Sequence, residues 1–119
     1  MLLDTYTWGA AGDALVFDKR FDAEGKAQFA VGGLSVSNAR VLTVSHQRQS
    51  GGKVRTLLDF TETDPIPDST TGATVQNRVY AVLDFSIYKT EAQKLSAIAR
   101  FAASLSNVAF VTKLIRGEV

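Results

Sequence analysis

The sequence contains no cysteine, only two prolines and a single histidine among its 119 residues. Without cysteine there is neither a disulfide framework nor a thiolate metal site, and this composition fits a reducing compartment. No apolar run approaches the roughly 20 residues of a transmembrane helix, and the N-terminal stretch MLLDTYTWG lacks the features of a signal peptide. We therefore expect a soluble intracellular product that has no membrane partner.

An excess of one charge is also lacking. Thirteen Lys and Arg are balanced by twelve Asp and Glu, which gives a formal net charge of +1. Whole-chain charge does not predict a polyanion partner, so any basic patch has to be local. The length and the 45% apolar content predict a single domain over residues 1–119.

Short strands are predicted over the first two-thirds of the chain, because apolar residues there alternate with a period of two between turn residues. Leu15, Phe17 and Phe21 are expected on one face of an N-terminal hairpin. A strand over residues 40–49 leads through the turn at residues 50–52 into a second strand that starts at Lys53.

A loop of about fifteen residues is predicted over residues 62–76, which contain both prolines and almost no large apolar side chains. Strand alternation resumes over residues 77–89. It places Val79, Ala81, Leu83, Phe85 and Ile87 on one side, with Arg78, Tyr80, Val82, Asp84 and Ser86 on the other.

The period changes to that of a helix at the C-terminal end. Thr90 and Gln93 match a capping box, and Leu95, Ile98 and Leu105 follow at helical spacing. The tail after Asn107 fits either a capped helix or a β-branched strand, and we favour a short helix. Strands followed by two helices predict an α+β domain whose helices cover one face of an antiparallel sheet.

The polar side chains of the central hairpin are unusual for a solvent face. Thr43, Ser45, Gln47, Lys53 and Arg55 alternate along the two strands, so hydroxyls, amides and cations are expected to share one face. Cations of this kind can offset phosphate charge, while hydroxyls and amides can bind unstacked bases.

An ordered set of motifs in residues 27–119 resembles the coat proteins of the single-stranded RNA bacteriophages, the leviviruses. The motifs are the Thr43-x-Ser45 strand, the Arg48-Gln49-Ser50 turn entry, a basic following strand, the long loop, the strand RVYAVLDFSI and the helix KTEAQKLSAIARFAASL. The resemblance implies an intertwined homodimer with one continuous sheet, each chain's helices lying across its partner. It also implies an icosahedral shell that encloses single-stranded genomic RNA, in a virion assembled in the bacterial host cytoplasm.

The resemblance further implies that the inner sheet face binds RNA, in several members as a specific translational operator hairpin. Tyr80 takes the place of a tyrosine that stacks on an RNA base. The residues expected to contact RNA are Thr43, Ser45, Arg48, Lys53, Arg55, Arg78 and Tyr80.

One departure from the family pattern affects Arg48. One more residue separates it from Ser45 than in the family, so strict alternation would place Arg48 on the opposite face. A β-bulge near His46 and Gln47 would restore the match, and we expect one there.

Two other classes of protein stay open at this point. A small cellular dimeric RNA-binding regulator could use the same face without assembling, although Pro65, Ile66 and Pro67 suit an assembly loop at the symmetry axes of a shell. A ligand-binding or isomerase-like α+β dimer would need a pocket lined with ionisable groups. The sequence contains no nucleophile elbow, paired-carboxylate motif or ligand cluster around His46, so we expect no enzyme, metal or cofactor.

Overall fold

The computed structural model of the chain describes residues 2–9, 12–23, 25–34, 38–68 and 70–118. They form two compact units, Met1–Asp84 and Phe85–Val119. The first unit is an antiparallel β-sheet and the second is a pair of helices, so the predicted α+β class with strands first and helices last is confirmed. The prediction of a single domain over residues 1–119 stays a prediction.

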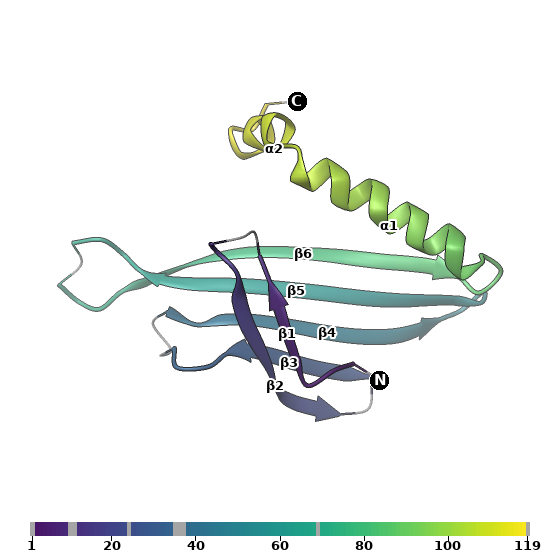
Figure 1. Cartoon of the computed structure of the whole chain (residues 1–119), viewed down its shortest axis with the longest axis horizontal. Coiled ribbons are helices and arrows are strands. Elements are labelled where there is room, and N and C mark those ends of the chain that lie inside the picture. The colour runs from purple at the N-terminus through teal and green to yellow at the C-terminus, as the bar shows by residue number, and fades with distance from the viewer. Residues whose placement is uncertain (1, 10–11, 24, 35–37, 69, 119) are drawn as a thin grey trace. The chain divides into compact units, whose positions relative to one another are not determined.

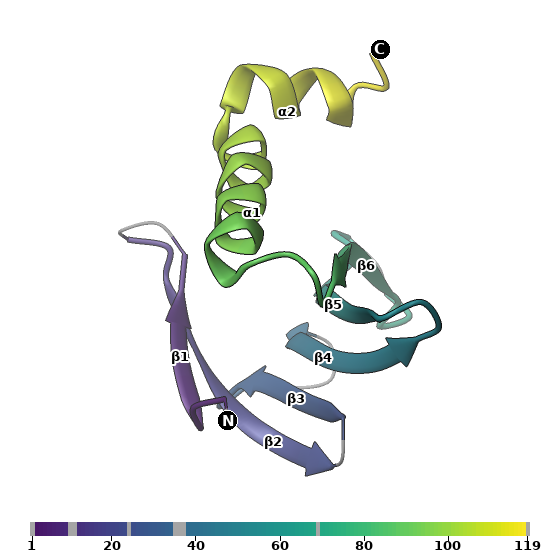
Figure 2. The same cartoon turned by 90° about the vertical axis from the view of Figure 1, so that its right-hand side faces the viewer.

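Six strands form the sheet, and each strand pairs with its neighbour in the chain (Figure 1). Figure 2 shows that the sheet curls, so that β1 and β2 do not lie flat beside the later strands. The strands are β1 (Thr5–Trp8), β2 (Leu15–Ala23), β3 (Lys26–Val31), β4 (Arg40–Gln49), β5 (Lys53–Pro65) and β6 (Thr74–Ser86).

The hairpin of β4 and β5 has an unbroken register. It extends from the pair Arg40 and Glu62 to the pair Gln49 and Lys53. The turn between them is possible because Gly51 and Gly52 adopt φ angles of 77° and 72°, which glycine reaches without steric cost. No bulge interrupts this hairpin, so the β-bulge expected near His46 and Gln47 is wrong.

A bulge does occur in the sheet, between Lys19 and Phe21 where β2 pairs with β3. The shift reverses the alternation of β2, so Lys19 pairs with Phe29 while Phe21 pairs with Gln28. Phe17 therefore lies on the core side and Phe21 on the opposite side. The prediction that Leu15, Phe17 and Phe21 share one face is wrong at Phe21 for this reason.

The core of the sheet is small and lies on one side of it. Among the described residues, the buried hydrophobic side chains are Phe17, Ala27, Phe29 and Val44. Trp8 contacts both phenylalanine rings, with ring centroids 5.0 Å and 6.1 Å away. We call this side the aromatic face, and its residues are Tyr6, Trp8, Leu15, Phe17, Ala27, Phe29, Val31, Leu42, Val44, Leu58 and Phe60.

The loop between β5 and β6 is shorter than the sequence predicts. β5 continues to Pro65 and β6 begins at Thr74, so residues 66–73 connect them rather than residues 62–76. The last rung is the hydrogen bond from the Ile66 amide to the Ala73 carbonyl, at 3.0 Å. Pro65 can end a strand because it needs no hydrogen bond donor there.

The second unit contains α1 (Glu91–Ser106) and α2 (Val108–Ile115). The predicted capping box is present, because the Thr90 hydroxyl accepts from the Gln93 amide and the Gln93 side chain accepts from the Thr90 amide. The Asn107 side chain caps α2, which confirms the short helix. No single helix in the described chain is long and apolar enough to cross a membrane, and only α1 and α2 together, bent by 70°, reach that length and composition.

Candidate nucleic-acid interface

Strand register places the polar side chains of three neighbouring strands on one face. Thr43 of β4 lies opposite Gln28 of β3 and Asp59 of β5, while Ser45 lies opposite Lys26 and Leu57. Directly paired residues of antiparallel strands point to the same side of a sheet. The hydroxyls, amides and cations of β3, β4 and β5 therefore form one continuous surface, opposite the aromatic face.

The last strand, β6, adds to this surface. Arg78 bonds to Asp59 and Asp84 bonds to Arg55, so the even-numbered residues of β6 lie on the same side as the odd-numbered residues of β5. The predicted side for Arg78 and Asp84 is confirmed, but the strand ends at Ser86, so the predicted extension to residue 89 is wrong. We call the combined surface the polar face, and its main residues are Lys26, Gln28, Thr43, Ser45, Gln47, Lys53, Arg55, Asp59, Gln76, Arg78, Tyr80 and Asp84.

Asp59 holds Arg78 in a fixed geometry. The guanidinium donates two hydrogen bonds to the two carboxylate oxygens, at 3.0 Å from Nε and 2.8 Å from Nη2. The hydrogen bond from Arg78 lowers the pKa of Asp59, against the opposing effect of burial. The same guanidinium carbon lies 5.1 Å from the centre of the Tyr80 ring, within range of a cation–π interaction. Asp59, Arg78 and Tyr80 therefore form an ordered platform that exposes a ring and a planar cation.

Arg55 has an acidic partner as well, because Asp84 accepts from its Nη2 at 3.3 Å. In the described part of the chain Lys53 has no such partner. Over β3 to β6 the polar face holds four cations, Lys26, Lys53, Arg55 and Arg78, and the two carboxylates of Asp59 and Asp84. The local balance is positive, although residues 1–84 as a whole contain eight Lys and Arg but ten Asp and Glu.

Arg48 does not belong to this surface. Since the register of β4 and β5 is unbroken, Arg48 pairs with Val54 and points to the side of the aromatic face. The structure thus brings together Thr43, Ser45, Lys53, Arg55, Arg78 and Tyr80 of the seven predicted RNA-contacting residues, and separates Arg48 from them.

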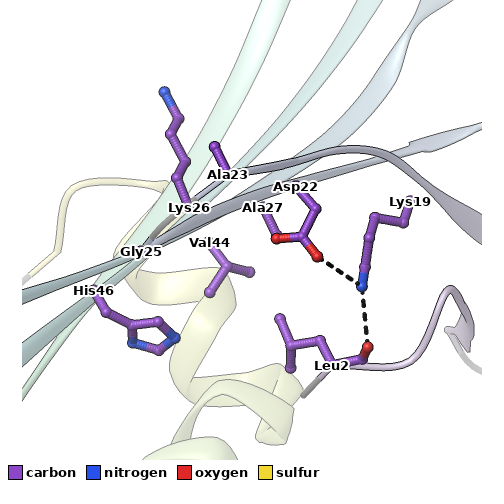
Figure 3. Close-up of a pocket in the computed structure, with 9 residues that line it drawn as sticks. All are labelled: Leu2, Lys19, Asp22, Ala23, Gly25, Lys26, Ala27, Val44 and His46. Carbon is purple, nitrogen blue, oxygen red and sulfur yellow. Dashed lines mark hydrogen bonds and ion pairs between the residues drawn. The ribbon is translucent and has the colours of Figure 1, made fainter.

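His46 also lies on the aromatic side, where its Nδ1 shares a hydrogen bond of 2.8 Å with the Thr56 hydroxyl. It lines a pocket of about 430 Å³ beside Lys19, Asp22 and Val44 (Figure 3). Lys19 donates to the Leu2 carbonyl at 3.0 Å and lies 3.4 Å from the Asp22 carboxylate.

Lys19 is a paired cation in this pocket. Although desolvation acts to lower it, hydrogen bonds with Asp22 and Asp4 raise the pKa of Lys19, so it stays an ammonium ion. An ammonium ion that is already paired supplies neither a base nor a nucleophile. The described part of the chain also holds no group of three or more His, Asp or Glu side chains placed to bind a metal ion.

Reasoning from the sequence missed four residues of the polar face, namely Lys26, Gln28, Asp59 and Gln76, whereas it placed Asp84 on the same side as Arg78 and Tyr80. Lys26 could have been found by extending the alternation of the central hairpin across β3. The carboxylates could not have been matched to their arginines, because the register of β5 against β6 depends on how many residues the connecting loop takes up.

The fold is a curled antiparallel sheet with sequential strand order, followed by two helices. No protein-family model matches the chain, and no curated protein matches its sequence. Solved structures do match. A virus-like particle of bacteriophage AVE019 has a TM-score of 0.77 at 12% identity, covering 98% of this chain and 97% of that chain.

Two further matches are of the same kind. The coat protein of bacteriophage EMS014 has a TM-score of 0.73 at 12% identity and covers 99% of this chain and 98% of that one. A virus-like particle of Beihai levi-like virus 21 has a TM-score of 0.69 at 14% identity, and the match covers 98% of this chain and 95% of that one. The chain thus has the levivirus coat protein fold.

Proposed function

We propose that this chain is the coat protein of a levi-like RNA bacteriophage. Its dimers would assemble into an icosahedral shell around single-stranded RNA, within the virion. The observation that carries the proposal is the structural likeness to phage shell proteins over nearly the whole length of both chains. The match includes the sheet, the loops and both helices of this chain. A match restricted to the sheet would be compatible with many functions.

The first part of the proposal is an obligate dimer. β6 is the last strand of the sheet, and its side chains are exposed on both sides, with Val79 and Tyr80 each 61% exposed. Neither helix has a buried residue, and Leu95 and Ile115 are 59% and 82% exposed. Long open strands and exposed apolar helices are costly in water. A second copy that pairs with β6 and receives the helices would remove both costs.

Two adjacent positions of α1 offer a matched test of the dimer. Leu95 belongs to the apolar stripe of the helix, whereas Ser96 lies roughly 100° further around the helix axis, and both are exposed in the single chain. Leu95→Asp should therefore break the dimer, while Ser96→Asp adds the same charge and should leave it intact. Sedimentation velocity measures the outcome. Equal effects of the two changes, or a folded wild-type monomer at micromolar concentration, would contradict an obligate dimer.

The second part of the proposal is RNA binding by the polar face. Lys53 and the arginines would contact phosphates, Tyr80 would stack on a base, and Thr43 and Ser45 would bind base edges or ribose hydroxyls. Because the rest of the sheet unit is acidic, RNA would be attracted to this face alone.

Lys53 and Arg48 form a matched pair for this second part, since they are cations on opposite faces of neighbouring strands. Lys53→Ala should reduce the slope of log affinity against log salt by about 0.7, the amount for one single-strand phosphate contact. Arg48→Ala should leave the slope unchanged. If Arg48→Ala has the larger effect, RNA binds the other face.

The third part concerns the loop between β5 and β6 as an assembly loop. Pro65 is the last residue of β5, and Ile66 and Pro67 follow it at the start of the loop. The two prolines remove backbone donors that could extend the sheet. In a closed shell of identical chains the same loop must meet itself at axes of different order. Replacing residues 66–73 by an Asn-Gly turn should preserve the dimer and its RNA affinity but change the particle size. Particles of unaltered size and stability would exclude an assembly role.

The experiment that tests the function as a whole is purification of the chain from bacteria, followed by size-exclusion chromatography and electron microscopy. The proposal predicts closed particles that contain nuclease-protected RNA. Dimers that bind RNA without forming particles would instead identify a cellular RNA-binding regulator.

A further inference from the structure

Arg40, the first residue of β4, holds the end of β5 through a set of short polar contacts. Its Nε lies 2.8 Å from the Glu62 carboxylate, and its Nη2 donates to the Asp64 carboxylate at 2.7 Å. Its Nη1 donates to the Thr63 carbonyl, also at 2.7 Å. One guanidinium thus bonds to three consecutive residues, in the forked geometry that distinguishes arginine from lysine.

This cluster is set into the sheet. The Arg40 side chain is only 18% exposed, and its Nη1 lies 3.2 Å from the carbonyl of Asn38 as well. The hydrogen bond to Asp64 raises the pKa of Arg40, against the effect of burial, so the cation is permanent. Partly buried charge-assisted hydrogen bonds are less screened by solvent than those at an open surface.

The neighbouring contacts extend this network to β6. The backbone amide of Thr63, a buried residue, donates to the Ala39 carbonyl at 2.9 Å, and the Thr63 hydroxyl accepts from the side-chain Nε2 of Gln76 at 3.2 Å. The last hydrogen bond between the two strands joins the Ile66 amide to the Ala73 carbonyl. Beyond this rung every described residue of the connection is exposed, including Pro67 and Asp68. The chain therefore changes from a hydrogen-bonded, partly buried strand at Asp64 to an exposed loop at Pro67.

We infer that Arg40 is the positioning residue that sets where the sheet ends and the assembly loop begins. By holding Glu62, Thr63 and Asp64 in the ladder, it limits the connection between β5 and β6 to residues 66–73. Without it β5 can separate from β4 and β6, and the connection lengthens toward the fifteen residues that the sequence predicts. Chains with connections of different length meet neighbouring dimers in different ways, so particle size becomes mixed. This inference rests on the proposed function only in its consequence for particles.

The test compares Arg40→Met with Arg48→Met. Both remove an arginine from β4 on the same side of the strand, and the structure gives Arg48 no ion pair among the described residues. Hydrogen exchange of the intact protein reports on the amides of Thr63 and Ile66. We expect Arg40→Met to lose tenfold or more of their protection, and Arg48→Met to retain it. Arg40→Lys should lose most of it too, because an ammonium ion cannot bond to three acceptors in a plane.

The milder variant Asp64→Asn removes one carboxylate and is expected to give an intermediate loss, which keeps the test valid if Arg40→Met does not fold. Unchanged protection in all variants would overturn the inference, whether or not particles form. Lost protection with particles of wild-type size would overturn its assembly consequence. Lost protection together with a broadened particle size distribution in electron micrographs would support both the role of Arg40 and its effect on assembly. A wild-type protein that forms no particle would count against the proposed function but would not affect the role of Arg40 in the sheet.

Discussion

Replacing Asp59 by Asn is expected to make the protein bind RNA more tightly and with a steeper salt dependence. Asp59 holds Arg78 through hydrogen bonds of 3.0 Å and 2.8 Å, so a phosphate has to compete with a carboxylate for that guanidinium. The substitution keeps the shape of the side chain and removes its charge. Arg78 then becomes available to RNA, and the polar face loses one of its two carboxylates.

The expected magnitude follows from the count of charges. One additional phosphate contact steepens the slope of log affinity against log salt by about 0.7 for a single strand. When the salt concentration rises from roughly 50 mM to 200 mM, the affinity of Asp59→Asn for RNA should therefore fall by a factor about 2.6 times larger than that of the wild type. Fluorescence anisotropy of a labelled single-stranded RNA, with dimers held below the concentration for assembly, measures both slopes.

Asp22→Asn is the matched control for this prediction. Asp22 pairs with Lys19 and points to the opposite side of the sheet, so its loss changes the net charge of the chain equally without touching the polar face. A slope that is unchanged or shallower in Asp59→Asn would refute the competition between carboxylate and phosphate. The same steepening in both variants would show that total charge, rather than this face, governs binding.

Three further outcomes are expected. Tyr80→Ala should weaken RNA binding by about 1–3 kcal/mol with little change in the salt slope, because stacking rather than charge is lost, whereas Tyr80→Phe should bind normally; a changed slope would argue against stacking. Phe29→Ala removes a side chain that is 1% exposed and should lower the free energy of unfolding by about 3–5 kcal/mol in urea titrations, and a loss below about 1 kcal/mol would contradict its place at the centre of the core. The pKa of Asp59 in the folded protein lies below its ordinary value of 3.8, so the stability that its carboxylate contributes is complete above about that pH and is lost as the pH falls through the lower folded value. The free energy of unfolding of Asp59→Asn should therefore depend less on pH in this range. Equal acid sensitivity of the variant and the wild type would contradict the pairing of Asp59 with Arg78.

The alternation of polar and apolar side chains along the strands was the most informative feature of the sequence for predicting the polar face. It placed Thr43, Ser45, Lys53 and Arg55 on one face, and this holds because the ladder of β4 and β5 has no irregularity to reverse it. The helix ends were predictable as well, since the capping residues Thr90 and Asn107 act through local hydrogen bonds.

Irregularities of the backbone were not predictable in the same way. The family pattern predicts a bulge in β4 that brings Arg48 onto the polar face, whereas the structure has a bulge in β2, which turns Phe21 away from the core. A bulge depends on how neighbouring strands pack, and the sequence of one strand does not reveal it. The predicted loop is too long because residues 62–76 contain both prolines and almost no large apolar side chains, whereas the contacts of Glu62 and Asp64 with Arg40 keep these two residues in the strand.

A cryo-electron microscopy reconstruction of the purified particles tests the proposal that this chain forms a shell whose polar face holds RNA. We expect a closed shell of dimers paired through β6, with the polar face directed inward and density for RNA beside Tyr80 and Lys53. A shell with the helices directed inward, or with RNA density against the aromatic side near Arg48, would contradict it.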